Sequence, residues 1–108
     1  MDTHEMTERI ERISANYAEH FGLDRSQEWF MLKLQEEMGE LTQAFMNLHG
    51  MGRDRGQSEE EIRQDFIDEC ADVFGQFLLF ARHHGVDLDE AVRRKWLRWE
   101  QPGDPGEG

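Results

Sequence analysis

The amino-acid sequence predicts an all-α protein, a four-helix-type bundle whose helices assemble through their faces. Its two prolines, Pro102 and Pro105, stand close to the end, so every earlier position is compatible with a helix. No stretch alternates apolar and polar residues with the period of two that a half-buried strand requires. Glycines and helix-capping patterns divide the chain into four helical segments, at about residues 3–20, 25–49, 58–84 and 87–100.

The first two helices are predicted by the spacing of apolar residues and by residues typical of helix ends. Ile10 and Tyr17 share one face of the first helix, and Gly22 is a natural residue to end it. Asp24, followed three residues later by Gln27, has the pattern of a capping box, so we expect the second helix to begin directly after it. A stretch with three glycines and alternating charges then predicts a loop before the third helix.

The third and fourth helices have similar signals at their ends. Ser58 with Glu61 is a second capping-box pattern, and Gly85 is placed to end the third helix. Asp87 with Glu90 predicts the start of the fourth helix, which we expect to reach residue 99 or 100.

The third helix is apolar on two opposite sides. At about 100° per residue, one face carries Ile62, Phe66, Val73, Phe77 and Phe80 together with Glu69, and the other carries Ile67, Ala71, Phe74, Leu78 and Ala81. A helix that is apolar on both sides is buried on both sides. In so short a chain the second face predicts contact with another subunit, in a homodimer or a homotetramer. The alternative is that a small bundle wraps this helix by itself.

Length and composition bound the class of protein. The 108 residues predict one helical domain, residues 1–100, with a disordered tail at 101–108. The formal net charge of −12 argues against binding to nucleic acid or to anionic membranes. Cys70 is the single cysteine, so no disulfide forms within the chain. The N-terminus is unlike a signal peptide and no apolar run approaches membrane-spanning length, so we expect a cytoplasmic protein.

Carboxylates interrupt the apolar stripes of both long helices. Glu37 falls in the middle of the stripe of the second helix and Glu40 at its edge, while Glu69 and Asp72 hold the same positions on the third. Antiparallel packing of these helices would bring the two pairs together. Converging carboxylates repel one another unless a cation compensates them. Oxygen ligands of this kind favour Mg²⁺ or Mn²⁺.

Two alternatives bear on this interpretation. Glutamates on helices are ordinarily solvent-facing, and each acidic motif taken alone is weak. A di-iron bundle would need Glu-x-x-His motifs, and the sequence contains none.

The acidic motifs resemble those of the MazG-like all-α nucleoside triphosphate pyrophosphohydrolases, whose signature is E-E-x-x-E followed by E-x-x-D. In this chain the two motifs are Glu36-Glu37-x-x-Glu40 and Glu69-x-x-Asp72. A downstream Gly-Val-Asp-Leu segment and Lys95 also match, and the likeness covers roughly residues 27 to 97.

The resemblance implies roles for individual residues. Glu37, Glu40, Glu69 and Asp72 would be Mg²⁺ ligands, and Glu36 would bind a further metal or orient the attacking water. The implied reaction is hydrolysis of a nucleoside triphosphate between its α and β phosphates, which gives the monophosphate and pyrophosphate. The implied biological role is removal of non-canonical or surplus triphosphates from the nucleotide pool.

Substrate contacts are less well matched than metal ligands. Lys95 matches a family lysine that contacts phosphates, Lys33 is placed to reach phosphate or to pair with the neighbouring acids, and Trp29 could stack on a base. Where the family often has an Asn four residues after the lysine, this chain has Trp99. The motif therefore leaves the base and sugar contacts undefined.

Three other functions compete with this one. A phosphoribosyl-ATP pyrophosphohydrolase and a dUTP/dUDP-specific hydrolase share the helical fold and the acidic motifs. From a different class comes a non-catalytic helical oligomerisation module.

Overall fold

The computed structural model describes residues 1–100, and these confirm the all-α prediction. The elements are α1 (Thr3–Phe21), α2 (Gln27–Leu48), α3 (Glu59–His83), α4 (Leu88–Lys95) and a short 3₁₀ turn, η1 (Leu97–Trp99). The tail predicted at 101–108 lies outside the described residues.

Most of the predicted helix ends are confirmed. The Ser58 hydroxyl accepts from the Glu61 backbone N–H and the Glu61 side chain accepts from the Ser58 N–H, which completes the capping box of α3. Gly22 ends α1 in the left-handed conformation, with a φ of 65° that favours glycine. The Asp87 side chain accepts from the backbone N–H of Glu90 at the start of α4.

The capping prediction for α2 was wrong, and so was the end predicted for the fourth helix. Ser26, not Asp24, is the N-cap of α2, and its hydroxyl accepts from the Trp29 backbone N–H at 3.1 Å. Only the residue next to the first turn can reach that N–H group, and Asp24 lies two residues too early. At the other end of the chain α4 stops at Lys95, and the tighter turn η1 follows it.

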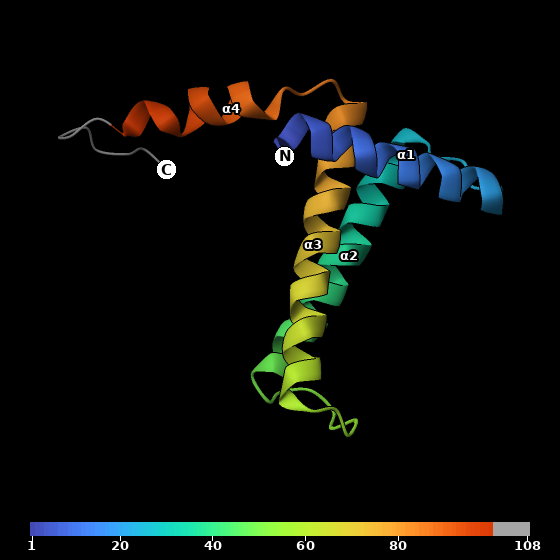
Figure 1. Ribbon diagram of the computed structural model, residues 1–108, viewed down its shortest axis with the longest axis vertical. Coiled ribbons are helices and arrows are strands. Elements are labelled where there is room, and N and C mark those ends of the chain that lie inside the picture. Colours follow the sequence, from blue (N-terminus) through green and yellow to red (C-terminus); the bar gives the residue numbers. More distant parts are fainter. Residues whose placement is uncertain (101–108) are drawn as a thin grey trace.

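Two long helices form the body of the molecule. α2 and α3 run antiparallel, side by side, and are joined by the loop at the bottom of Figure 1. α1 crosses the opposite end of this hairpin, and α4 leaves the same end and points away from it (Figure 1). The site described below therefore depends mainly on the register of α2 against α3.

Ion pairs hold α1 across the end of the hairpin. The Arg25 guanidinium donates to both carboxylate oxygens of Glu11, at 2.9 and 2.7 Å, and Arg82 of α3 pairs with Glu8 at 3.1 Å. The hydrogen bond from Arg25 lowers the pKa of Glu11 below its ordinary value, although partial burial opposes this shift. Arg25 also lies over the ring of Phe30, 5.3 Å from its centroid, and so connects α1 to the core of the hairpin.

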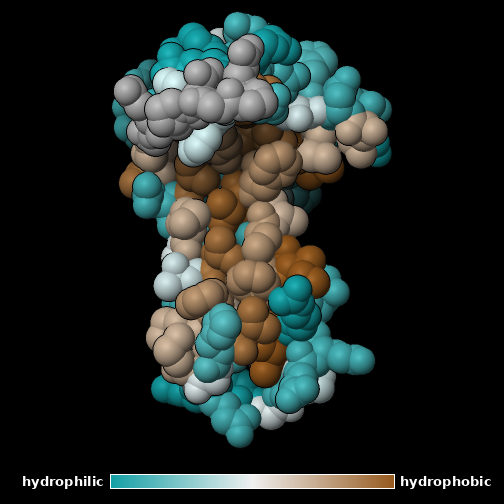
Figure 2. All heavy atoms as spheres, turned by 90° about the vertical axis from the view of Figure 1, so that its left-hand side faces the viewer, coloured by the Kyte–Doolittle hydropathy of each residue, from teal (hydrophilic) through white to brown (hydrophobic). Residues whose placement is uncertain are grey.

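The core of a single chain is small. Among residues 1–100 the buried apolar residues are Ala18, Phe30, Ala44, Leu78, Leu79 and Ala81. The radius of gyration is 17.3 Å, whereas a compact domain of this size has about 13 Å. Figure 2 shows apolar side chains gathered along the length of the hairpin on one open face.

The two-faced character of the third helix is visible in its exposure. On the second face, Leu78 and Ala81 are buried at the end that α1 crosses. Further along the same face Ile67 and Phe74 are 45% and 49% exposed. The chain by itself thus covers only one end of this face.

None of the helices within residues 1–100 combines the length and the apolar character needed to cross a bilayer.

Candidate metal centre

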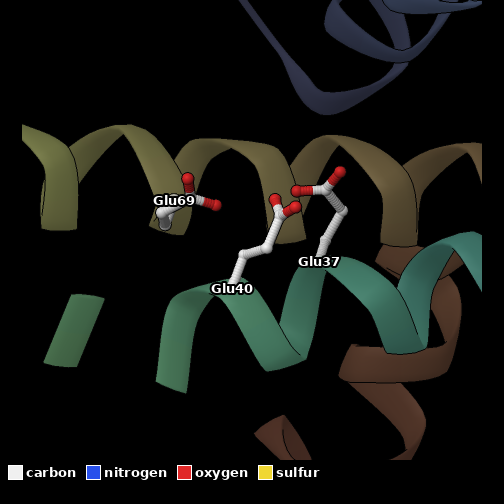
Figure 3. Close-up of side chains that lie close together, drawn as sticks. All are labelled: Glu37, Glu40 and Glu69. Carbon is white, nitrogen blue, oxygen red and sulfur yellow. The ribbon is translucent and has the colours of Figure 1, made fainter. Parts of the chain in front are cut away.

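Three carboxylates from the two long helices meet near the middle of the hairpin. Glu37 and Glu40 lie on successive turns of α2, and Glu69 faces them from α3 (Figure 3). Each offers one oxygen, and all three oxygens lie within 4.8 Å of one another. The antiparallel register therefore produces the convergence that the apolar spacing predicted.

The environment of these carboxylates opposes their negative charge. Glu37 is 8% exposed, and burial, followed by the negative charge of Glu40, raises its pKa to about 7. A hydrogen bond with Glu40 and the charge of Asp72 raise this pKa further, while Lys33 lowers it. Burial and then the charge of Glu40 also raise the pKa of Glu69. The cluster is therefore short of positive charge.

Two oxygens of the cluster are unpaired within the described part of the chain. Oε2 of Glu37 and Oε2 of Glu69 are buried and accept no hydrogen bond from residues 1–100. A buried acceptor without a partner is destabilising unless a donor or a cation reaches it. The set of donor atoms is all carboxylate oxygen, the kind that Mg²⁺ and Mn²⁺ bind. The residues present thus fit a hard divalent cation.

Asp72 and Glu36 lie at the border of the cluster. Asp72 is exposed and is outside the group of three, but its charge raises the pKa values of Glu37 and Glu69, so it lies close to both. The side chain of Glu36 is 57% exposed and pairs with Lys33 at 3.4 Å. Both carboxylates thus lie on the solvent side of the cluster.

Lys33 supplies positive charge next to the cluster. Its ammonium group lies 3.8 Å from Oε1 of Glu37 and 3.4 Å from Oε1 of Glu36. Lys33 therefore pairs with the neighbouring acids, one of the two roles that the sequence left open for it. Its side chain is still 31% exposed to solvent.

The other predicted substrate contacts lie farther from the carboxylates. Trp29 is in the first turns of α2, two turns or about 12 Å along the helix from Glu37, and its ring packs edge-on against Phe30. Lys95 is the last residue of α4, which points away from the hairpin (Figure 1). The chain by itself does not bring Lys95 to the carboxylates.

A pocket beside the cluster was not predicted from the sequence. It has a volume of about 310 Å³, and Glu40 and Glu69 form the end next to the cluster. Toward the loop it is lined by Gln43, Ala44, Asn47, Gln57, Ile62 and Asp65. Gln43 and Asn47 follow Glu40 at intervals of three and seven residues, so they share its helix face. That spacing was the available signal, but polar residues at helical spacing usually indicate a solvated surface.

The fold and the site together define a class: an all-α protein in which three carboxylates of an E-E-x-x-E and an E-x-x-D motif converge between two antiparallel helices. Residues 4–94 match the family described as phosphoribosyl-ATP pyrophosphohydrolase. The chain belongs to this family, and the resemblance to the MazG-like all-α pyrophosphohydrolases is thereby confirmed.

The chain is similar to the uncharacterized protein YvdC of Bacillus subtilis (strain 168). It is 36% identical over 64 residues, which cover 56% of this chain and 59% of the relative. The match thus spans less than two thirds of that protein's length. No solved structure matches the chain.

Proposed function

We propose that this protein is a Mg²⁺-dependent pyrophosphohydrolase that cleaves a nucleoside triphosphate between the α and β phosphates. Membership of a pyrophosphohydrolase family supports the reaction type. The observation that carries the proposal is the group of three carboxylates within 4.8 Å, two of which have a buried oxygen without a partner in residues 1–100. A site that lacks positive charge suits a polyanionic substrate that arrives with divalent cations.

Each carboxylate has a proposed role. Glu37, Glu40 and Glu69 hold Mg²⁺ or Mn²⁺ from inside the hairpin, and Asp72 completes the ligand set from its border. When bound, the metal neutralises phosphate oxygens and lowers the pKa of the attacking water. Glu36, with its exposed carboxylate, orients that water or binds a further metal.

The charge of Lys33 suits a role at the phosphates. Its ammonium group lies at the edge of the cluster, where it offsets part of the negative charge of Glu36 and Glu37. It has exposed surface left with which to contact a phosphate oxygen. Trp29, whose ring is only partly buried, is the candidate for stacking on a base that extends toward the start of α2.

Two substrates are supported by different observations. The acidic motifs match enzymes that clear non-canonical or surplus nucleoside triphosphates, which is our first choice. The name of the family supports phosphoribosyl-ATP as the second. Both substrates are cleaved at the same α–β bond, so one carboxylate centre serves either reaction. A dUTP/dUDP-specific activity stays as a third alternative.

We also propose that the active form is a homodimer or homotetramer. The radius of gyration of 17.3 Å, the small core and the exposed side chains of Ile67 and Phe74 support this assembly. Assembly would also give Lys95 a substrate to bind, since α4 points away from the carboxylates of its own chain. We propose that Lys95 contacts the phosphates of a substrate held by the carboxylate cluster of a neighbouring subunit.

The test is pyrophosphate release from a panel of canonical, deoxy and modified nucleoside triphosphates, dUTP and phosphoribosyl-ATP, with Mg²⁺. We expect release from at least one of them, and a loss of 100-fold or more in Glu69→Gln. Glu28→Gln is the matched control, because Glu28 is an exposed glutamate of α2 outside the cluster. If the wild type releases no pyrophosphate from any member of the panel, the proposal is wrong and the oligomerisation module becomes the better interpretation.

A further inference from the structure

The pocket next to the carboxylates has an ordered polar wall. The Gln57 side-chain amide donates to the Asp65 carboxylate at 2.8 Å, which fixes the orientation of Gln57 at the end of the loop. On the opposite helix, Asn47 lies against the backbone of Gly52: a Cβ added to Gly52 would come within 1.6 Å of Oδ1 of Asn47. The absence of a side chain at residue 52 therefore allows the Asn47 amide to stay where it is.

The charges that line this pocket are all of one sign. Glu40, Asp65 and Glu69 are the charged residues of its lining, and no basic residue is among them. A phosphate can approach only the end where Glu40 and Glu69 belong to the carboxylate cluster, because divalent cations would compensate the repulsion there. The rest of the lining, toward the loop, carries Asp65 and uncharged polar groups, which would repel a phosphate but suit an uncharged ligand.

The polar groups at that end suit a nucleoside. The side-chain amides of Gln43, Asn47 and Gln57 each contain a donor and an acceptor. Such groups can pair with the ring nitrogens, carbonyl and amino groups of a base. The Asp65 carboxylate can accept from a sugar hydroxyl, as acidic residues do in dinucleotide-binding folds. The apolar side chains of Ala44 and Ile62 complete the lining.

We infer that this pocket, and not the surface at Trp29, binds the uncharged nucleoside part of the substrate. Asn47 and Gln57 are the specificity-determining residues, and Gly52 is the positioning residue for Asn47. The inference rests on the proposed function, because the triphosphate must lie on the carboxylates for the nucleoside to enter the pocket. It also predicts that a further phosphate on the nucleoside is disfavoured, since the pocket wall is acidic.

The experiment compares wild type with Asn47→Ala, Gln57→Ala and Gly52→Ala, using the best triphosphate of the panel. Loss of a hydrogen bond to a neutral group corresponds to roughly a three- to tenfold effect. We expect KM to rise by that factor in Asn47→Ala and Gln57→Ala, and by less in Gly52→Ala, with kcat within about twofold of wild type. Asn16→Ala, which removes an exposed amide of α1, is the matched control and should leave KM unchanged.

A binding measurement separates the nucleoside from the phosphates. Calorimetric titration with Mg²⁺ and the corresponding nucleoside monophosphate should show the same weakening in Asn47→Ala and Gln57→Ala. Titration with Mg²⁺ and inorganic tripolyphosphate should give equal affinities for wild type and the variants. Helix content by circular dichroism, checked for each variant, separates a lost contact from a lost fold.

The possible outcomes distinguish this inference from the proposed function. If wild type releases pyrophosphate but neither Asn47→Ala nor Gln57→Ala changes KM or monophosphate affinity, the pocket assignment is overturned and the proposed function stands. Equal losses of monophosphate and tripolyphosphate affinity would also overturn the assignment, as would a changed molecular mass of the variants in solution. If wild type releases no pyrophosphate at all, the proposed function fails, and the pocket assignment fails with it.

Discussion

Replacing Glu37 with glutamine should stabilise the metal-free protein at neutral and alkaline pH. The pKa of Glu37 is about 7, compared with an ordinary value of 4.5, so the native state favours the protonated, uncharged side chain. Because the native pKa is the higher one, the wild type loses stability as the pH rises from about 4.5 to about 7. At 1.36 kcal/mol per pKa unit, the loss amounts to about 3 kcal/mol. Glutamine is uncharged at every pH and nearly isosteric with protonated glutamate, so it avoids this loss.

The assay is urea denaturation of Glu37→Gln and wild type with EDTA, at several pH values between 4 and 8 and at a fixed protomer concentration. The difference in free energy of unfolding should be near zero at pH 4 and reach about 3 kcal/mol at pH 8. Glu36→Gln is the control on the adjacent residue, where the side chain is 57% exposed. Its loss of an exposed ion pair should change the free energy of unfolding by about 0.5 kcal/mol. A difference between Glu37→Gln and wild type that does not grow with pH would refute the argument.

Four further predictions concern the metal, the assembly and the attachment of α1. Mg²⁺ or Mn²⁺ at millimolar concentration should raise the melting temperature of wild type but not of Glu69→Gln, and an equal rise in both would contradict the metal site. Below pH 7 the apparent metal affinity should fall by up to roughly tenfold per pH unit in calorimetric titrations, because a proton competes for Glu37. Light scattering should give a multiple of the 12.8 kDa protomer mass, and Phe74→Glu should reduce it toward one protomer; a wild-type monomer would refute the assembly. Arg25→Met should lower the free energy of unfolding by about 1 to 3 kcal/mol at pH 7, because the part-buried Glu11 then keeps only its longer ion pair with Arg82, at 3.9 Å. An unchanged urea midpoint would contradict this.

The part of the site that the sequence predicted depends on helical geometry alone. Glu37 and Glu40 differ by three residues and Glu69 falls in the apolar stripe of α3, so the spacing determines which way each side chain points. Two long helices joined by one loop also pack antiparallel. Because they are similar in length, their midpoints then lie next to each other. Periodicity and connectivity were therefore enough to predict that these three carboxylates converge.

Other features depend on information that periodicity does not contain. The choice between Asp24 and Ser26 as N-cap depends on the path of the chain between α1 and α2, since both residue types cap helices well. The direction of α4, and with it the place of Lys95, depends on a short connection after Gly85. The place of the Asn47 side chain in the pocket depends on the loop, where Gly52 meets the end of α2 in a tertiary contact without a sequence pattern.

The small core and the acidic cluster both lower the stability of a single, metal-free chain. One chain buries few large side chains in residues 1–100, and the charged form of Glu37 removes about 3 kcal/mol from the stability of the fold. That loss is a large share of the 5–15 kcal/mol typical of a folded domain. A cation at the carboxylates and a second subunit on the exposed face of α3 would each bind the native state and not the unfolded chain. Each would therefore stabilise the fold by mass action, and removing either should make the protein more dependent on the other.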